Sequence, residues 1–228
     1  MAHQKRLSAP QHYPIKRKEN TYIVKGSGPH TEDTGFPLRV LLREVLDFAK
    51  SADEVDDILQ DGNIQVNGRL VDNAQLTVGF MDVISIDKID TDYRVLQTAD
   101  GLAVQEIDDS GKRLYRVEDK TTLKGGITQL NLDAGENIET EEDFETQSSL
   151  LVDLDDATVE EEFELTDGNA AYITGGQHVG TIATIVGTTV VPGSQSNKVQ
   201  LETDDGETFE TVEEFVYVVG DDDPAVEL

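Results

Sequence analysis

Apolar residues repeat with a helical period early in the chain. From residue 38 to residue 50 they recur every three or four positions, which places them on one face of a helix: Leu38, Leu41, Leu42, Val45, Leu46 and Ala49. A second helix is predicted directly afterwards, because Ser51 and Glu54 have the spacing of a capping box. Gly62 fits the left-handed position that follows a helix end.

The spacing changes to alternation after these helices. Ile64 and Val66 flank a polar residue, and Asn67-Gly68 follows, the dipeptide typical of a two-residue hairpin turn. Further strands are predicted over 82–86, 93–96, 102–107, 114–117, 150–152 and 163–165, and residues 135–148 are predicted to be an acidic loop. The chain is therefore expected to have a mixed α+β fold that is mostly β.

Residues 171–220 contain short strand-like segments between tight turns. Gly175-Gly176, Pro192-Gly193 and Asp205-Gly206 mark the turns, and Gly180 lies inside a strand pattern. A glycine in a strand indicates a bulge or a close approach of backbone. Several short strands joined in this way predict a small five-stranded barrel.

The composition favours several small modules and argues against common enzyme chemistries. Of 228 residues 37% are hydrophobic and none is Trp or Cys, which favours β-rich modules over one large core. Without Cys there is no disulfide, thiolate nucleophile or cysteine zinc site. P-loop, HExxH and GxSxG patterns are missing, and the four His lack paired ligand spacing. We expect no catalytic activity, no cofactor, no small-molecule substrate and no metal site.

No apolar run approaches the length of a membrane span, and the first residues are charged where a signal peptide is apolar. A soluble cytoplasmic protein without a membrane partner is expected. The formal net charge is −29, from 47 acidic and 18 basic residues. The acids are dispersed along the chain, which is typical of the solvated surface of a protein from a halophile.

Basic residues are concentrated where the acids are sparse. The first 25 residues hold six Lys or Arg and one acid, whereas residues 125–228 hold one base and 26 acids. Pro and Gly interrupt residues 1–37, which predicts a basic extended arm that a partner orders. The natural partner of such an arm is a phosphate backbone. A second basic concentration runs from Arg94 to Lys124.

Two segments resemble known RNA-binding modules. The run "ILQDGNIQVNGRLV" followed by "GFMDVISI" resembles the small RNA-binding module named after bacterial small-subunit ribosomal protein four, with acids on its second helix where that module is usually basic. The Gly-Gly-x-x-x-Gly-x-x-x-x-Ile spacing from Gly175 resembles the KOW motif. That resemblance implies an SH3-like barrel whose glycine loop approaches RNA.

The order of these segments, from "KRLSAPQHY" to "TGGQHVGTI", resembles the archaeal and eukaryotic small-subunit ribosomal protein four family, the "e" type, over nearly the whole chain. The resemblance implies a ribosomal protein without catalytic activity that binds small-subunit ribosomal RNA and neighbouring ribosomal proteins. It implies an arm (1–37), a helical RNA-binding module (38–88), a β-rich central domain (89–170), a KOW barrel (171–220) and an acidic tail (221–228).

The basic residues and the two resemblances together predict a set of RNA-binding residues. In chain order they are His3, Lys5, Arg6, His12, Tyr13, Lys16, Arg17, Lys18, Tyr22, Lys25, His30, Asn67, Arg69, Arg94, Lys112, Arg113, Arg116, Lys120, Lys124, Gly175, Gly176, Gln177, His178 and Gly180.

Three other functions fit parts of the sequence. A transcription elongation factor with a KOW barrel would travel with RNA polymerase, but the helical module argues against it. An RNA-modifying enzyme with such a module would need a large catalytic domain, and the middle of this chain is too short for one. An acidic chaperone would bind basic proteins through residues 125–228 alone.

Overall fold

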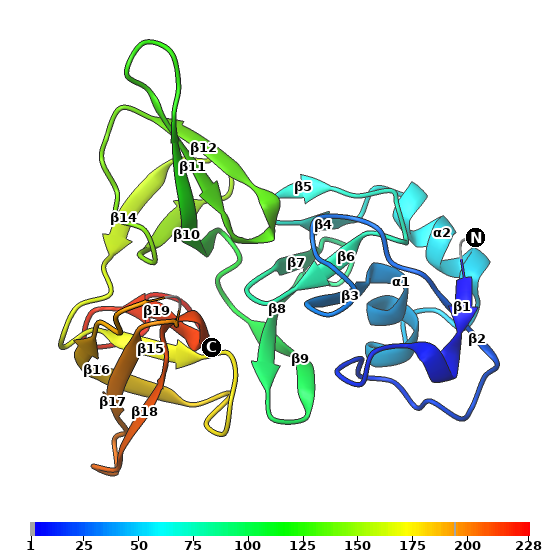
Figure 1. Cartoon of the computed structure of the whole chain (residues 1–228). Coiled ribbons are helices and arrows are strands. Elements are labelled where there is room, and N and C mark those ends of the chain that lie inside the picture. The colour runs from blue at the N-terminus through cyan, green and yellow to red at the C-terminus, as the bar shows by residue number, and fades with distance from the viewer. Residues whose placement is uncertain (1–2, 194) are drawn as a thin grey trace. The chain divides into compact units, whose positions relative to one another are not determined.

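The structure, a computed structural model, describes residues 3–193 and 195–228. The chain divides into two compact units (Figure 1). The first comprises Met1–Leu96 and Asp100–Ser110, and the second comprises Gln97–Ala99 and Gly111–Leu228. Most of the chain is in β-strands and few residues are helical, as the sequence predicts.

The first unit contains a five-stranded sheet with the strand order β5-β4-β7-β8-β9. Its strands are β4 (Ile64–Val66), β5 (Arg69–Leu70), β7 (Val83–Ile86), β8 (Thr91–Thr98) and β9 (Gly101–Ile107). The turn between β4 and β5 is the predicted Asn-Gly hairpin. Asn67 and Gly68 both have left-handed backbones, with φ of 51° and 73°, as a type I′ turn requires.

Two helical segments pack beside this sheet, and the first is shorter than predicted. α1 (Leu38–Val40) continues into a π-helical turn, η2 (Leu41–Val45), and does not reach residue 50. The amide of Leu46 donates to the carbonyl of Leu41 over 2.9 Å, and Asp47 then has a φ of 54°, which breaks the helix. The apolar period is retained up to Ala49, which is buried, so periodicity alone placed the helix end too late.

The second helix agrees with its prediction. α2 (Ala52–Gln60) starts after Ser51, whose hydroxyl accepts the amide of Glu54 over 3.1 Å. The Glu54 carboxylate accepts the amide of Lys50 over 2.6 Å. Gly62 follows the helix with a φ of 70°.

The N-terminal segment is packed against the rest of the first unit, whereas the sequence predicts an extended arm. β1 (His3–Lys5) pairs antiparallel with β2 (Tyr22–Val24), and a 3-10 turn, η1 (Arg6–Ser8), follows β1. β3 (Gly35–Pro37) pairs with β6 (Thr77–Gly79). Tyr13 and Ile23 lie in the same core as the helices. Pro and Gly therefore give the segment an irregular path without detaching it.

The second unit contains two five-stranded sheets. The first has the order β12-β11-β10-β13-β14. Its strands are β10 (Lys112–Thr122), β11 (Thr128–Leu132), β12 (Asn137–Thr140), β13 (Ser149–Asp153) and β14 (Val159–Phe163), and the 3-10 turn η3 (Asp133–Gly135) joins β11 to β12. The prediction of a loop over 135–148 is thus wrong at β12, where Ile138 packs on the core between exposed Asn137 and Glu139.

The other sheet has the order β18-β17-β16-β15-β19. Its strands are β15 (Ala170–Ile173), β16 (Ile182–Thr189), β17 (Lys198–Glu202), β18 (Thr208–Val212) and β19 (Val216–Gly220), with the 3-10 turn η4 (Glu213–Phe215) before β19. The two sheets of this unit meet at Tyr217, whose buried hydroxyl donates to the carbonyl of Leu114 over 2.9 Å. Burial raises the pKa of this hydroxyl well above its usual range.

Candidate nucleic-acid interface

Exposed cations gather on the N-terminal segment. Lys5 on β1 lies opposite Tyr22 on β2, and both are exposed. The ring of His3 meets the ring of Tyr22 edge-on, with centroids 5.2 Å apart. This strand pair offers a cation and an exposed aromatic side chain on one surface, a combination that can contact a phosphate and stack on a base.

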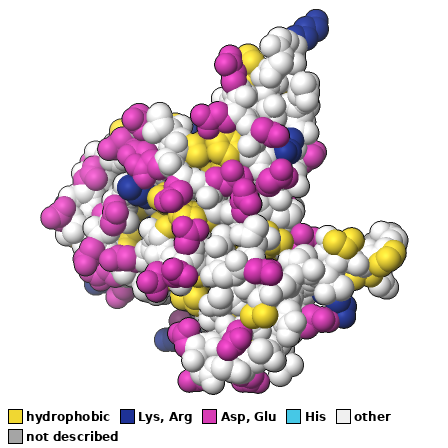
Figure 2. All heavy atoms as spheres, turned by 90° about the vertical axis from the view of Figure 1, so that its left-hand side faces the viewer, with side chains coloured by type: hydrophobic (Ala, Val, Ile, Leu, Met, Phe, Trp, Pro, Cys, Tyr) yellow, Lys and Arg dark blue, Asp and Glu magenta, His cyan; other side chains and the backbone are white. Residues whose placement is uncertain are grey.

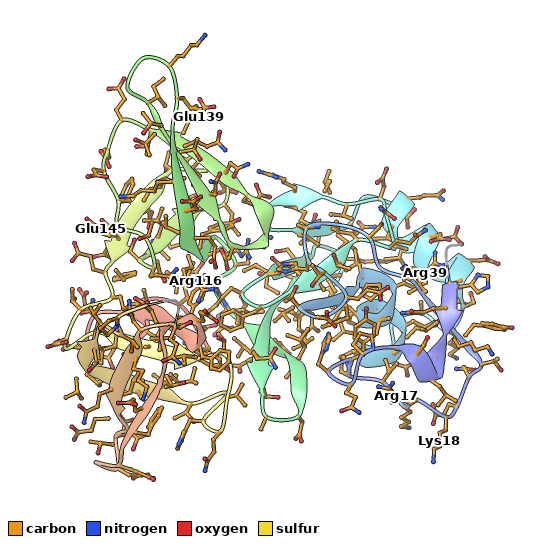
Figure 3. The ribbon with its side chains drawn as sticks, viewed as in Figure 1. Arg17, Lys18, Arg39, Arg116, Glu139 and Glu145 are labelled. Carbon is orange, nitrogen blue, oxygen red and sulfur yellow. The ribbon has the colours of Figure 1, made fainter. Side chains whose placement is uncertain are left out.

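Arg17 shapes the loop that carries the next two cations. Its guanidinium donates to the carbonyls of Pro10 and Leu7, each over 2.9 Å, and to the carbonyl of Ala9. Lys16 and Lys18 on either side are exposed, and Lys18 extends away from the ribbon (Figure 3). Arg17, predicted to bind RNA, thus has its donors occupied by the loop that it holds.

Arg6 is a structural residue although it was predicted to bind RNA. Its side chain is 1% exposed and its two terminal nitrogens donate to the Glu44 carboxylate over 3.1 and 2.9 Å. Its Nε donates to the carbonyl of Lys16 over 2.7 Å. The hydrogen bond from Arg6 lowers the pKa of Glu44, and the same bond raises the pKa of Arg6.

The aromatic residues predicted to bind RNA in the arm also divide into exposed and buried ones. Tyr22 is exposed, whereas Tyr13 is buried, and burial raises the pKa of its hydroxyl to about 12. His12 is partly buried, with its Nε2 3.3 Å from the carbonyl oxygen of Gly35. His30 is buried, with Nε2 2.8 Å from the Asp82 carboxylate. Tyr13 and His30 therefore serve the core.

Asp82 organises the hairpin of the first unit. It accepts the side-chain amide of Asn67 and the backbone amide of Gly79, each over 2.8 Å. Asn67 was predicted to bind RNA, yet its side chain also accepts the amide of Val83 over 2.9 Å and so supports the turn. Arg69, on the other side of the turn, is exposed.

The acids of α2 face solvent, and one of them forms an ion pair. Asp53, Glu54 and Asp57 are exposed, and Asp56 lies 2.5 Å from a guanidinium nitrogen of Arg39. This helix therefore presents negative charge outward, where an RNA phosphate would be repelled.

The second basic concentration does not form an open cationic surface. Arg94 and Arg113 are fully buried, and Arg113 lies over the ring of Tyr115 at 4.0 Å. The other members are largely engaged: Lys112 with Glu160 at 2.6 Å, Lys120 with Asp143 at 3.2 Å, and Arg116 with Glu118 at 2.6 Å. Lys124 is exposed. The bases of this set mostly stabilise the fold or neutralise neighbouring acids.

The glycine loop before β16 has the predicted close approach of backbone, but Gly180 lies in the turn that precedes β16 and not inside a strand. A Cβ on Gly175 would come within 2.7 Å of the Phe215 ring, and Gly176 has a left-handed φ of 83°. Gly180 also has a left-handed φ, 85°, and leaves room for the backbone of Thr98. His178 stacks on Phe209 at 4.0 Å, whereas Gln177 is exposed. The loop thus presents Gln177 and glycine backbone outward, with His178 partly covered.

Acidic side chains are spread over the face of the molecule shown in Figure 2 rather than gathered in one patch. Within residues 3–193 and 195–228, no group of three or more His, Asp or Glu could hold a metal ion. Among the same residues, no helix is long and apolar enough to cross a membrane.

Comparison with known proteins relates the chain to one family over nearly its full length. Residues 89–159 match the model described as Ribosomal family S4e, and residues 2–33 match the RS4NT (NUC023) domain. A protein of Methanosphaera stadtmanae named small ribosomal subunit protein eS4 is 39% identical over 230 residues, which cover 99% of this chain and 95% of that protein. The protein of the same name from Methanococcus vannielii is 37% identical, with coverage of 99% and 97%.

A solved structure is also similar. The crystal structure of the 30S ribosomal protein S4e from Thermoplasma acidophilum has a TM-score of 0.70 and 27% sequence identity to this chain. The match covers 83% of this chain and 96% of that one.

Proposed function

Because this chain belongs to the S4e family of ribosomal proteins, we propose that it is a structural constituent of the small ribosomal subunit. There it binds ribosomal RNA and contacts neighbouring ribosomal proteins, and so works in the cytoplasm, on the ribosome. The family is structural and not enzymatic. Family membership also disfavours the polymerase-associated factor, the modifying enzyme and the acidic chaperone.

The observation that supports RNA binding by this chain is the exposed cationic surface of its N-terminal segment. In a chain with a net charge of −29, Lys5, Lys16, Lys18 and Lys25 are all exposed within 25 residues. Arg6 and Arg17 are engaged by the fold and hold the segment in shape. The segment therefore meets RNA as a preformed surface, which reduces the ordering entropy that binding would otherwise cost.

The finer division of the chain belongs to the same proposal. Residues 1–37 and the module 38–88 form one RNA-binding part, residues 89–170 a central domain, and residues 171–220 an SH3-like barrel of the KOW type, before the acidic tail 221–228. The left-handed Gly176 and Gly180 and the tight contact of Gly175 with Phe215 support the KOW assignment. The dispersed acids support adaptation to concentrated salt, where self-repulsion is screened.

The salt dependence of RNA binding tests the cationic surface. Replacing Lys16 and Lys18 by Gln removes two exposed charges, so affinity for full-length small-subunit ribosomal RNA is expected to fall. Each lost phosphate contact should reduce the slope of log affinity against log salt by about 0.7–0.9, the range between single strands and duplex DNA. The double variant should therefore lose roughly 1.5 from that slope.

The matched control is the double change Lys50→Gln and Lys88→Gln. Both residues are exposed in the same unit and the change in net charge is identical. The control is expected to keep the wild-type slope. Equal slopes for the two double variants would contradict the assignment of the cationic surface.

A further inference from the structure

The sequence of the second unit contains a long interval without acids. No Asp or Glu occurs in the 34 residues from Gly168 to Leu201. At the frequency in the whole chain, 47 acids in 228 residues, a stretch of this length would hold about seven. The interval runs from β15 through the glycine loop and β16 into β17.

Burial does not explain this interval, because fourteen of its described residues are exposed. The neighbouring segment 202–214 shows what exposed positions of the same sheet otherwise carry, since seven of its thirteen residues are Asp or Glu. Many exposed positions from Glu202 through β18 to Glu214 are therefore acidic, whereas the exposed positions along β16 and its turn are uncharged.

The exposed residues of this interval concentrate on the hairpin of β16 and β17, described over residues 186–193 and 195–198, which we call the neutral hairpin. Val190 is 74% exposed and Val186 is 41% exposed. Thr188 and Thr189 are also exposed, and residues 191–197 are Val, Pro, Gly, Ser, Gln, Ser and Asn. Figure 2 shows the end of this hairpin as the projection at the right, with apolar and uncharged side chains.

Hydrogen bonds hold the residues near the end of the hairpin. The amide of Val191 donates to the side chain of Asn197 over 3.2 Å, and Asn197 donates to the Glu213 carboxylate over 2.9 Å. Ser196 donates to Glu214. The single cation, Lys198, pairs with Glu210 at 2.5 Å. The hairpin thus presents hydroxyl, amide and apolar groups, and its one charged side chain is neutralised by Glu210 on β18.

This chemistry fits the sugar edge of an RNA helix. The wide, shallow minor groove of double-stranded RNA displays 2′-hydroxyls, which hydroxyl and amide groups can bond, and phosphates line its borders. A carboxylate at that position would be repelled by the phosphates and would lose hydration. Uncharged contacts release no counterions, so they keep their strength in concentrated salt.

We propose that the neutral hairpin is a second RNA contact, which lies against the sugar edge of a double-stranded segment of the small-subunit ribosomal RNA. This inference rests on the proposed function and adds a contact outside the N-terminal segment and the glycine loop. The interval without acids is the sequence signal of this contact, and its one Lys or Arg, Lys198, is paired with Glu210.

A single added charge tests the proposal. Thr188→Glu places a carboxylate on the exposed face of β16, opposite Val199, and is expected to weaken binding to full-length small-subunit ribosomal RNA by about tenfold through repulsion of phosphates. Thr208→Glu is the matched control, the same change at an exposed strand Thr of the same sheet, opposite Glu202. The control should change affinity by less than about twofold, and its like-charge neighbour makes it the less stable of the two variants.

The salt dependence separates this contact from the lysine surface. Thr188→Val should weaken binding without changing the slope of log affinity against log salt, because no phosphate-bound cation is lost.

Equal affinities of the Thr188→Glu and Thr208→Glu proteins would overturn the proposed RNA contact of the neutral hairpin while leaving the proposed function intact. Normal RNA affinity of Thr188→Glu combined with failure to enter small subunits would also overturn it, in favour of a protein partner. Failure of the wild-type chain to bind the RNA would overturn both proposals.

Discussion

Arg6 and Glu44 show how a cation of the N-terminal segment becomes part of the core. Their side chains are 1% and 13% exposed, and the two-pronged contact joins residues 38 positions apart. The sequence marks Arg6 only as one of six bases in the first 25 residues. No neighbouring residue in the sequence distinguishes Arg6 from Lys16 or Lys18, because the acid that pairs with Arg6 lies in η2. Local charge patterns therefore identified the basic segment but not which of its bases face outward.

Because this ion pair is buried, Glu44→Gln is expected to lower the free energy of unfolding strongly. Removal of one partner from a buried ion pair leaves the other charge uncompensated, which typically costs 3–5 kcal/mol. We expect chemical denaturation to show a loss of about 3 kcal/mol in the free energy of unfolding. The control is Asp56→Asn, which breaks the pair with Arg39, whose side chains are 20% and 43% exposed. That change should cost less than about 1 kcal/mol.

The pH dependence of stability follows from the same pair. The folded pKa of Glu44 is lowered, so the ionised carboxylate stabilises the fold fully above its ordinary pKa. That contribution is lost as pH falls through the lowered folded pKa. The difference in unfolding free energy between wild type and Glu44→Gln should therefore be constant near neutrality and shrink on the acid side. A difference that is the same at every pH would contradict the ion pair.

At the scale of elements, the sequence predicts those structures whose signals are local. The Asn-Gly hairpin, the capped helix α2 and the glycine turns all rest on residues within a few positions of one another. η2 and β12 were not predicted, because a π-helical turn has no apolar signature of its own and acids mask the alternation around Ile138. β11 was also missed, although it forms a local hairpin with β10 in which Thr122 pairs with Thr128.

A substitution at Gly79 tests the packing of β6 against His30. A Cβ at this position would lie 2.4 Å from Nδ1 of the buried His30 ring, which is held by Asp82. Gly79→Ala is expected to lower the free energy of unfolding by about 1–3 kcal/mol, the usual cost of overpacking. Gly187→Ala is the control, because a Cβ there meets nothing within 4 Å and its φ is not left-handed. Thermal unfolding that ranks the two variants equally would contradict the packing.

For the whole molecule, the charge distribution separates surfaces of different use. The net charge of −29 is carried by acids dispersed over the body. Two surfaces depart from it: the exposed lysines of the N-terminal segment and the neutral hairpin of β16 and β17, which has no acid before Glu202. Composition predicted the first surface, because an excess of bases is visible in a count. Composition did not predict the neutral hairpin, because that surface is defined by a lack of acids. A lack of acids is informative only where the residues are known to be exposed, and exposure comes from the structure.

The proposed function requires this chain to assemble into small ribosomal subunits. Sedimentation of an extract of cells that carry the tagged chain, through a sucrose gradient at high salt, measures this directly. We predict that the wild-type chain migrates with the small subunit, and that the Lys16, Lys18 double variant shifts in part to the top of the gradient. Migration of the wild-type chain as a free 25.0 kDa protein would contradict the account.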